Sequence, residues 1–197
     1  MEKALAAWLM LAAAIAVPPA GPRETVATTV GRVVGALHGD QAAGRVQTDH
    51  VAEAKRIARG RFDYDDVARR VLSHHWSART PEEQTEFVRL FAQLLEGAYL
   101  NRLEGSAGGR MVYTSETIDG TYATVRSRLT MGRSDVSIDY RMHLRDGRWQ
   151  VYDAVIDGLS LVSTYRSQFD RVIQAESYAA LVERLRKRTV LETQVRY

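Results

Sequence analysis

The segment Trp149–Phe169, WQVYDAVIDGLSLVSTYRSQF, changes its hydrophobic period in the middle and thereby decides the fold. Before Gly158 the run is apolar and has the length of a strand. From Leu161 onward the apolar residues recur at helical spacing, with polar residues between them. A strand therefore passes through one glycine into a helix. This junction is either ordinary core or the wall of a pocket.

The residues before this junction have a period of two, which predicts an antiparallel meander. Four strands are expected, at residues 110–118, 121–131, 135–145 and 148–157. Asp119-Gly120 and Asp146-Gly147 are typical of two-residue hairpin turns. One face of the third strand carries Val136, Ile138, Tyr140, Met142 and Leu144, and the other face is charged. We expect a sheet with one buried face and one face in water.

The first half of the chain has the helical period of 3.6 residues. Apolar residues recur in this way over 26–37 and 51–58, and a third segment begins near residue 62. Thr80-Pro81-Glu82-Glu83 is typical of a helix start, with an N-cap, a proline at the first position and a capping box. A last helix carries the apolar residues of 178–185. Helices, then strands, then helices predict one α+β domain over residues 23–190.

The N-terminus, MEKALAAWLMLAAAIAVPPAG, predicts export. Its apolar run, residues 4–17, is short for a membrane span but typical of the central region of a secretory signal. Ala14-Ile15-Ala16 is similar to a cleavage site, so a signal peptide is expected over residues 1–16 and the protein is expected in an exported compartment. The chain has no cysteine, which excludes thiol nucleophiles, disulfides and cysteine-based zinc sites.

Charge and motifs exclude several classes of function. Lys and Arg total 27 against 24 acids, and the charges are interleaved, so nucleic acid is not an expected partner. The sequence contains no HExxH, GxSxG, P-loop or GxGxxG motif. His74 and His75 are adjacent, so on a helix their rings would point about 100° apart and are not expected to bind one metal ion.

Asp153 and Asp157 are the remaining candidates for chemistry. Both fall on one face of the predicted fourth strand, where a buried carboxylate pair could act in acid–base catalysis. The alternative is structural pairing with an arginine of the neighbouring strand, such as Arg141, and we favour it.

Several of these segments together resemble a known family. They are Phe62-Asp63-Tyr64, Trp76, the stripe of Phe87, Phe91, Leu94 and Tyr99, and the block from W-x-V-Y-D at Trp149 to Y-R-S-Q-F at Phe169. In order and spacing, over about residues 25–188, they closely resemble the MlaC family of periplasmic phospholipid-binding proteins, also called toluene-tolerance proteins. A hopanoid-associated relative, the HpnM type, shares much of the pattern.

The resemblance implies helices and a sheet wrapped around a deep cavity for acyl chains. It implies a carrier rather than an enzyme, with no metal or cofactor. It also implies lipid shuttling between an outer-membrane lipoprotein–porin complex and an inner-membrane ABC transporter with a substrate-binding ring, which would maintain the lipid asymmetry of the outer membrane.

We expect the cavity to be lined by apolar and aromatic side chains of the long helix, the sheet and the helix after Gly158. The expected lining is Phe87, Phe91, Leu94, Leu95, Tyr99, Tyr140, Met142, Trp149, Val151, Val155, Leu161, Val162 and Tyr165. Arg166 is expected at the mouth, where a guanidinium can meet a phosphate, or else in an ion pair with Asp170 or Asp157.

Periodicity cannot distinguish a filled core from a cavity with the same lining. Two other readings therefore stay open. One is a small enzyme that uses Asp153 and Asp157, and the other is an interaction module with a filled core.

Overall fold

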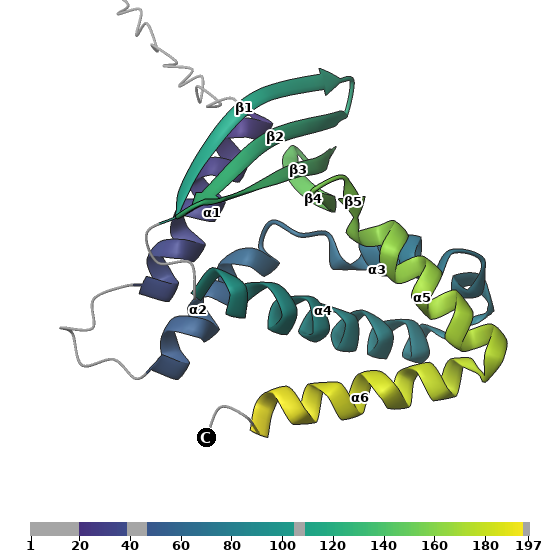
Figure 1. Ribbon diagram of the computed structural model, residues 1–197. Coiled ribbons are helices and arrows are strands. Elements are labelled where there is room, and N and C mark those ends of the chain that lie inside the picture. Colours follow the sequence, from purple (N-terminus) through teal and green to yellow (C-terminus); the bar gives the residue numbers. More distant parts are fainter. Residues whose placement is uncertain (1–19, 39–46, 105–108, 195–197) are drawn as a thin grey trace, which may run out of the picture.

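The computed structural model describes residues 20–38, 47–104 and 109–194, so the predicted signal peptide lies outside the described residues (Figure 1). The helices are α1 (Pro22–His38), α2 (Gln47–Arg59), α3 (Tyr64–Leu72), the 3₁₀ helix η2 (Ser73–Ala78), α4 (Pro81–Glu104), α5 (Leu161–Ala175) and α6 (Tyr178–Gln194). The strands are β1 (Arg110–Asp119), β2 (Tyr122–Met131), β3 (Ser134–Arg145), β4 (Arg148–Ile156) and β5 (Leu159–Ser160). The predicted α+β class is confirmed.

The sheet is an antiparallel meander in the order β1-β2-β3-β4-β5, so the prediction of four strands is short by one. The reason is the turn at Asp157 and Gly158, where φ is 47° and 82°. Two consecutive residues in the left-handed region form a tight hairpin turn that reverses the chain. Leu159 and Ser160 therefore run back along Ile156 and Val155 before α5 begins.

A bulge interrupts the pairing of β3 with β4. Arg141 pairs with Asp153 and Met142 pairs with Val151, which leaves Tyr152 as an extra residue. An extra residue shifts the alternation of side chains by one position. Side chains of β4 after the bulge therefore lie on the opposite face from the one that strict alternation predicts.

The helices α3, α4, α5 and α6 form a core of their own, separate from the sheet. Phe87, Phe91 and Phe169 stand at its centre, and Phe169 meets the other two rings edge-on at centroid distances of 5.9 and 5.6 Å. The predicted capping box at the start of α4 is confirmed: the Thr80 amide donates to Glu83 at 3.0 Å, and the Glu83 amide donates to the Thr80 hydroxyl at 3.3 Å.

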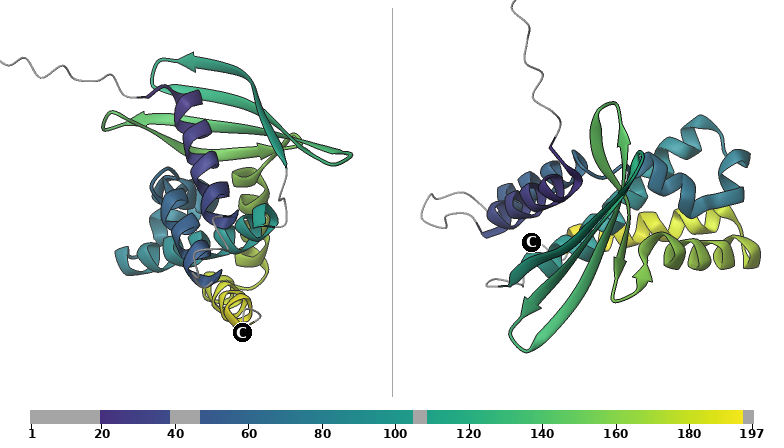
Figure 2. Two further views of the ribbon diagram at one scale, coloured as in Figure 1. Left: turned by 90° about the vertical axis from the view of Figure 1, so that its left-hand side faces the viewer. Right: turned by 90° about the horizontal axis from the view of Figure 1, so that it is seen from above.

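The sheet and the helical core form two layers, and α1 bridges them on one side. Figure 2 shows α1 crossing one face of the sheet, with α4 and α6 side by side beyond it. The other face was expected in water, but α3 covers part of it. There His143 is buried, and its Nε2 lies 3.0 Å from Oδ2 of Asp63. Within the described residues, no helix is both long and apolar enough to span a bilayer.

Candidate functional site: an apolar cavity under the sheet

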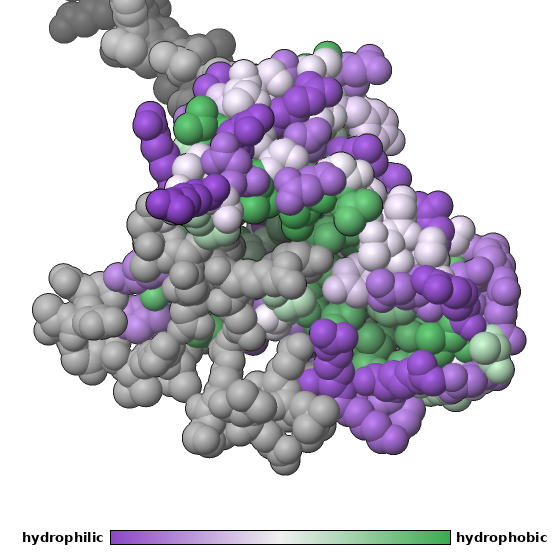
Figure 3. All heavy atoms as spheres, viewed as in Figure 1, coloured by the Kyte–Doolittle hydropathy of each residue, from purple (hydrophilic) through white to green (hydrophobic). Residues whose placement is uncertain are grey.

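A cavity of about 310 Å³ lies between α1, the sheet and the start of α5. Apolar atoms gather at this level, between the strands and the helices below them (Figure 3). Its wall consists of Thr25, Val26, Thr29, Val30, Val33, Ala58, Arg61, Phe62, Tyr64, Leu95, Glu96, Met111, Leu129, Met131, Val136, Ile138, Tyr140, Met142, Val151, Ala154, Ile156 and Leu161. Most of these side chains are hydrocarbon, so the cavity suits an apolar ligand.

The helix α1 contributes its wall through one face. Val26, Val30 and Val33 follow each other at helical spacing and line the cavity. The two threonines on this face direct their hydroxyls to the backbone: Thr29 donates to the carbonyl of Thr25 at 2.6 Å, and Thr25 donates to that of Ala20 at 3.3 Å. The helix therefore needs no ligand to complete the hydrogen bonds of these hydroxyl groups.

The opposite wall is the inner face of β3, where Ile138, Tyr140 and Met142 alternate with outward-facing residues. Burial raises the pKa of the Tyr140 phenol far above its ordinary value, so this group stays neutral. The β3 wall is therefore uncharged.

One carboxylate lies in the wall, and an arginine is paired with it. Glu96 on α4 is only 2% exposed, and Arg59 binds it through two parallel hydrogen bonds of 2.6 and 2.9 Å. Tyr64 also shares a hydrogen bond with Glu96, and burial raises the pKa of its phenol. A buried carboxylate needs such partners to remain charged.

Arg61 is different, because it lines the cavity and forms no ion pair with any carboxylate that the structure describes. Its backbone is fixed, since the Val151 amide donates to the Arg61 carbonyl at 2.8 Å. Sequence reasoning missed this residue. The available signal was its position directly before Phe62-Asp63-Tyr64, the first segment that carries the family resemblance.

Five of the residues expected in the lining lie in the wall of the cavity. They are Leu95, Tyr140, Met142, Val151 and Leu161. They come from α4, β3, β4 and α5, so segments far apart in the sequence meet around one space. Whether they contact a lipid stays a prediction.

Other residues expected in the lining do not line this cavity. Phe87, Phe91, Leu94 and Val162 are buried in the helical core, and Tyr165 packs against it. Phe87 and Phe91 pack against aromatic rings of α5 and α6 instead of the sheet. Trp149 is buried in the cluster beneath the sheet that includes Val26 and Met142, but it does not reach the cavity.

Three further residues that were expected at the cavity, Val155, Arg166 and Tyr99, are not part of its wall as far as the structure describes it. Val155 follows the bulge and therefore lies on the outer face of β4. Arg166 is exposed on α5, outside the cavity wall, and its expected partners Asp157 and Asp170 bind other groups. Tyr99 belongs to the residues whose side chains the structure does not describe.

Asp153 has the arginine partner that we favoured, whereas Asp157 binds a serine of β3 instead of an arginine. Asp153 is 4% exposed, pairs with Arg141 at 3.2 Å and accepts a 2.7 Å hydrogen bond from the Ser160 hydroxyl. Asp157 accepts from the Ser137 amide at 2.9 Å. These contacts hold the ends of the β4–β5 hairpin and leave no carboxylate pair facing a common space.

Residues 27–187 match the family described as MlaC protein. The chain belongs to the MlaC family. Among curated relatives of this MlaC protein, toluene tolerance protein ttg2D of Pseudomonas putida is 24% identical over 157 residues, which cover 78% of this chain and 73% of the relative.

A solved structure has the same fold. It is the phospholipid-binding protein from Ralstonia solanacearum in complex with a phospholipid, with a TM-score of 0.78 and 29% identity over 88% of this MlaC chain and 99% of that one. The architecture described above is therefore that of a protein that was solved with phospholipid bound.

Proposed function

We propose that this protein is a periplasmic phospholipid carrier that holds acyl chains in the cavity under the sheet. The observation that carries the proposal is the hydrocarbon wall around an open space of about 310 Å³. A filled core would have closed this space, and close packing is the rule in protein interiors. The phospholipid complex of the Ralstonia solanacearum protein supports the same ligand.

The energetics of lipid in water explain why such a cavity is useful. Burial of each methylene group stabilises by about 0.8 kcal/mol, so a long acyl chain exposed to water costs roughly 10 kcal/mol. A lipid that crosses an aqueous compartment as a monomer needs a protein that covers its chains.

The lipid phosphate has a candidate partner in Arg61. A phosphate is best bound by a guanidinium, which donates two parallel hydrogen bonds. Arg61 is half-buried, faces the cavity and has no described counter-ion. The proposed headgroup contact therefore moves from Arg166 on the exposed side of α5 to Arg61 between α2 and α3.

The carrier role also requires an exported protein and membrane complexes that supply and receive the lipid. We propose export through the signal peptide of residues 1–16 and exchange of lipid with an inner-membrane ABC transporter ring and an outer-membrane lipoprotein–porin complex, in support of outer-membrane asymmetry. Membership of the MlaC family supports these partners.

Mass spectrometry of the natural cargo tests the proposal. The full chain is produced in a Gram-negative host, purified from the periplasmic fraction and extracted with organic solvent, and total phosphorus is measured per chain. We expect phospholipid near one molecule per chain and a mature N-terminus near residue 17. A folded protein without lipid would contradict the carrier role, and a polycyclic triterpenoid in place of phospholipid would assign the cavity to hopanoids.

A further inference from the structure

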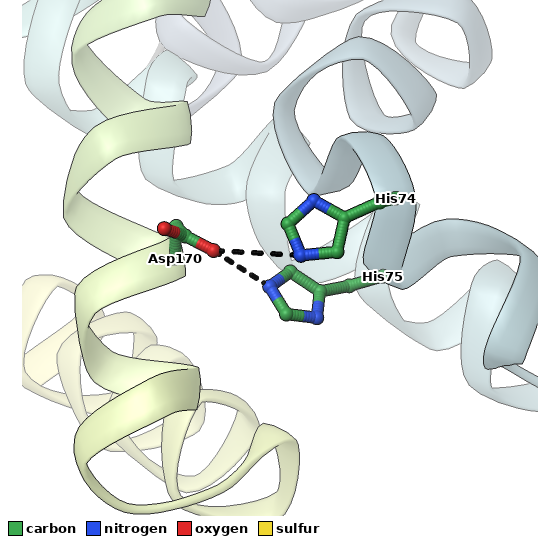
Figure 4. A group of neighbouring side chains, drawn as sticks. All are labelled: His74, His75 and Asp170. Atoms are coloured by element: carbon green, nitrogen blue, oxygen red, sulfur yellow. Dashed lines mark hydrogen bonds and ion pairs between the residues drawn. The ribbon is translucent and has the colours of Figure 1, made fainter.

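We propose that His74, His75 and Asp170 form a zinc site that joins η2 to α5. The two histidines lie in η2, and the aspartate comes from the middle of α5. Figure 4 shows both rings turned toward the carboxylate. The expectation that adjacent histidines diverge is wrong here, because the ring centroids are only 3.9 Å apart.

The backbone directly before the two histidines has an unusual conformation. Ser73 has a φ of 50°, in the left-handed region that a residue other than glycine rarely adopts. At Ser73 the helix α3 ends and the chain turns into η2. Backbone strain of this kind is found at functional sites more often than elsewhere.

The distances suit zinc. Nε2 of His75 lies 2.8 Å from Oδ1 of Asp170, Nε2 of His74 lies 3.7 Å from the same oxygen, and all three ligand atoms lie within 4.8 Å of one another. With zinc–ligand bonds of about 2.0–2.1 Å, the ligand atoms of a tetrahedral site are about 3.4 Å apart. The two observed distances lie on either side of that value, so small side-chain rotations complete the site.

The donor set and its surroundings also fit. Imidazole nitrogen and carboxylate oxygen are ordinary zinc ligands, and three protein ligands leave a fourth position for water. The other oxygen of Asp170 accepts a 2.9 Å hydrogen bond from Gln174, one turn further along α5. Such a second contact orients a ligating carboxylate. The His74 side chain is 69% exposed, so the metal can enter from solvent.

The position of the site gives it a consequence for the cavity. The helix α5 begins at Leu161, which lies in the cavity wall, and Phe169 beside Asp170 is buried in the helical core. Zinc between η2 and α5 therefore stabilises the arrangement in which Leu161 closes the wall. The inference that zinc binds is independent of the lipid function.

Calorimetric titration and thermal unfolding with zinc chloride test the site in the exported full-length protein, after removal of any affinity tag. We expect one zinc ion per chain and a melting temperature about 5–10 °C higher at a zinc concentration 100-fold above the dissociation constant. His74→Ala, at an exposed position, and the isosteric Asp170→Asn should each weaken binding at least about 10-fold.

His38→Ala is the matched control, because His38 is an exposed histidine at the end of α1. It should bind zinc like the unchanged protein. The proposal is overturned if zinc leaves the melting temperature of the unchanged protein where it was, or if His74→Ala and Asp170→Asn bind zinc as tightly as His38→Ala.

Discussion

Leu161 and Val162 are neighbours in the first turn of α5, yet their side chains pack in different places. Leu161 lies in the wall of the cavity, whereas Val162 is 5% exposed and belongs to the helical core. The amide of Val162 donates to Asp153 at 3.1 Å, which fixes the helix start against β4. The same substitution at the two positions should therefore have two different effects.

Leu161→Asp is expected to keep the fold and lose the lipid, because a carboxylate facing an acyl chain is costly to desolvate. Val162→Asp is expected to lower the free energy of unfolding by at least about 3 kcal/mol, since it places an unpaired charge in the packed core. Urea unfolding together with lipid per chain distinguishes the two. Equal lipid content in Leu161→Asp and the unchanged protein would contradict the assignment of the wall.

Filling the cavity should displace lipid without unfolding the protein. Ile138 on β3 points into the space, so Ile138→Trp is expected to reduce lipid per chain several-fold while the melting temperature is kept. Val112→Trp is the matched control, because Val112 is 41% exposed on β1 and does not line the cavity. The cavity assignment is wrong if both variants carry the same lipid.

Arg61→Ala should weaken phospholipid binding about 10-fold or more, which corresponds to the loss of a charged hydrogen bond worth about 1.5–3 kcal/mol. The affinity for diacylglycerol, which lacks a phosphate, should stay the same. Arg166→Ala serves as the control, because Arg166 is exposed on α5. Both affinities can be measured by transfer of fluorescent lipid from vesicles, and an equal loss for the two lipids would show that Arg61 acts on the cavity and not on the phosphate.

Asp66 should make stability fall in acid. Burial acts to raise the pKa of this carboxyl, but hydrogen bonds from Arg70 and Arg69 outweigh it and hold the pKa below its ordinary value of about 4. The stabilisation is therefore complete above pH 4 and is lost as the pH falls through the lowered pKa. Asp66→Asn should cost roughly 2 kcal/mol at pH 7 and show a shallower loss of stability below pH 4.

The neighbouring Asp65 provides the control for this prediction, because it is exposed in the same helical turn. Asp65→Asn should unfold at pH 7 and at pH 3 like the unchanged protein. Urea unfolding at both values checks the pair, and a steeper acid loss in Asp66→Asn than in the unchanged protein would contradict the sign of the effect.

Local signals determined much of the architecture. Two-residue turns at Gly120 and Gly147 require a positive φ, and the structure has 56° and 71° there. The capping box at Thr80 and Glu83 marks the start of α4, and its hydrogen bonds lie within four residues of sequence. Such features are encoded by short stretches, so periodicity and turn chemistry were sufficient to predict them.

Tertiary structure decided which apolar residues face the cavity. The stripe on α4 is equally compatible with a core and with a cavity wall, and only the packing of Phe169 against Phe87 and Phe91 assigns it to the core. Val155 changed faces because of one extra residue in β4, and a bulge depends on the partner strand rather than on the strand itself. Arg61 and the pair His74 and His75 gained their surroundings from elements that are distant in the chain. Local propensity determines helices, strands and turns, whereas the identity of a cavity wall depends on contacts between elements that a single stretch of sequence does not contain.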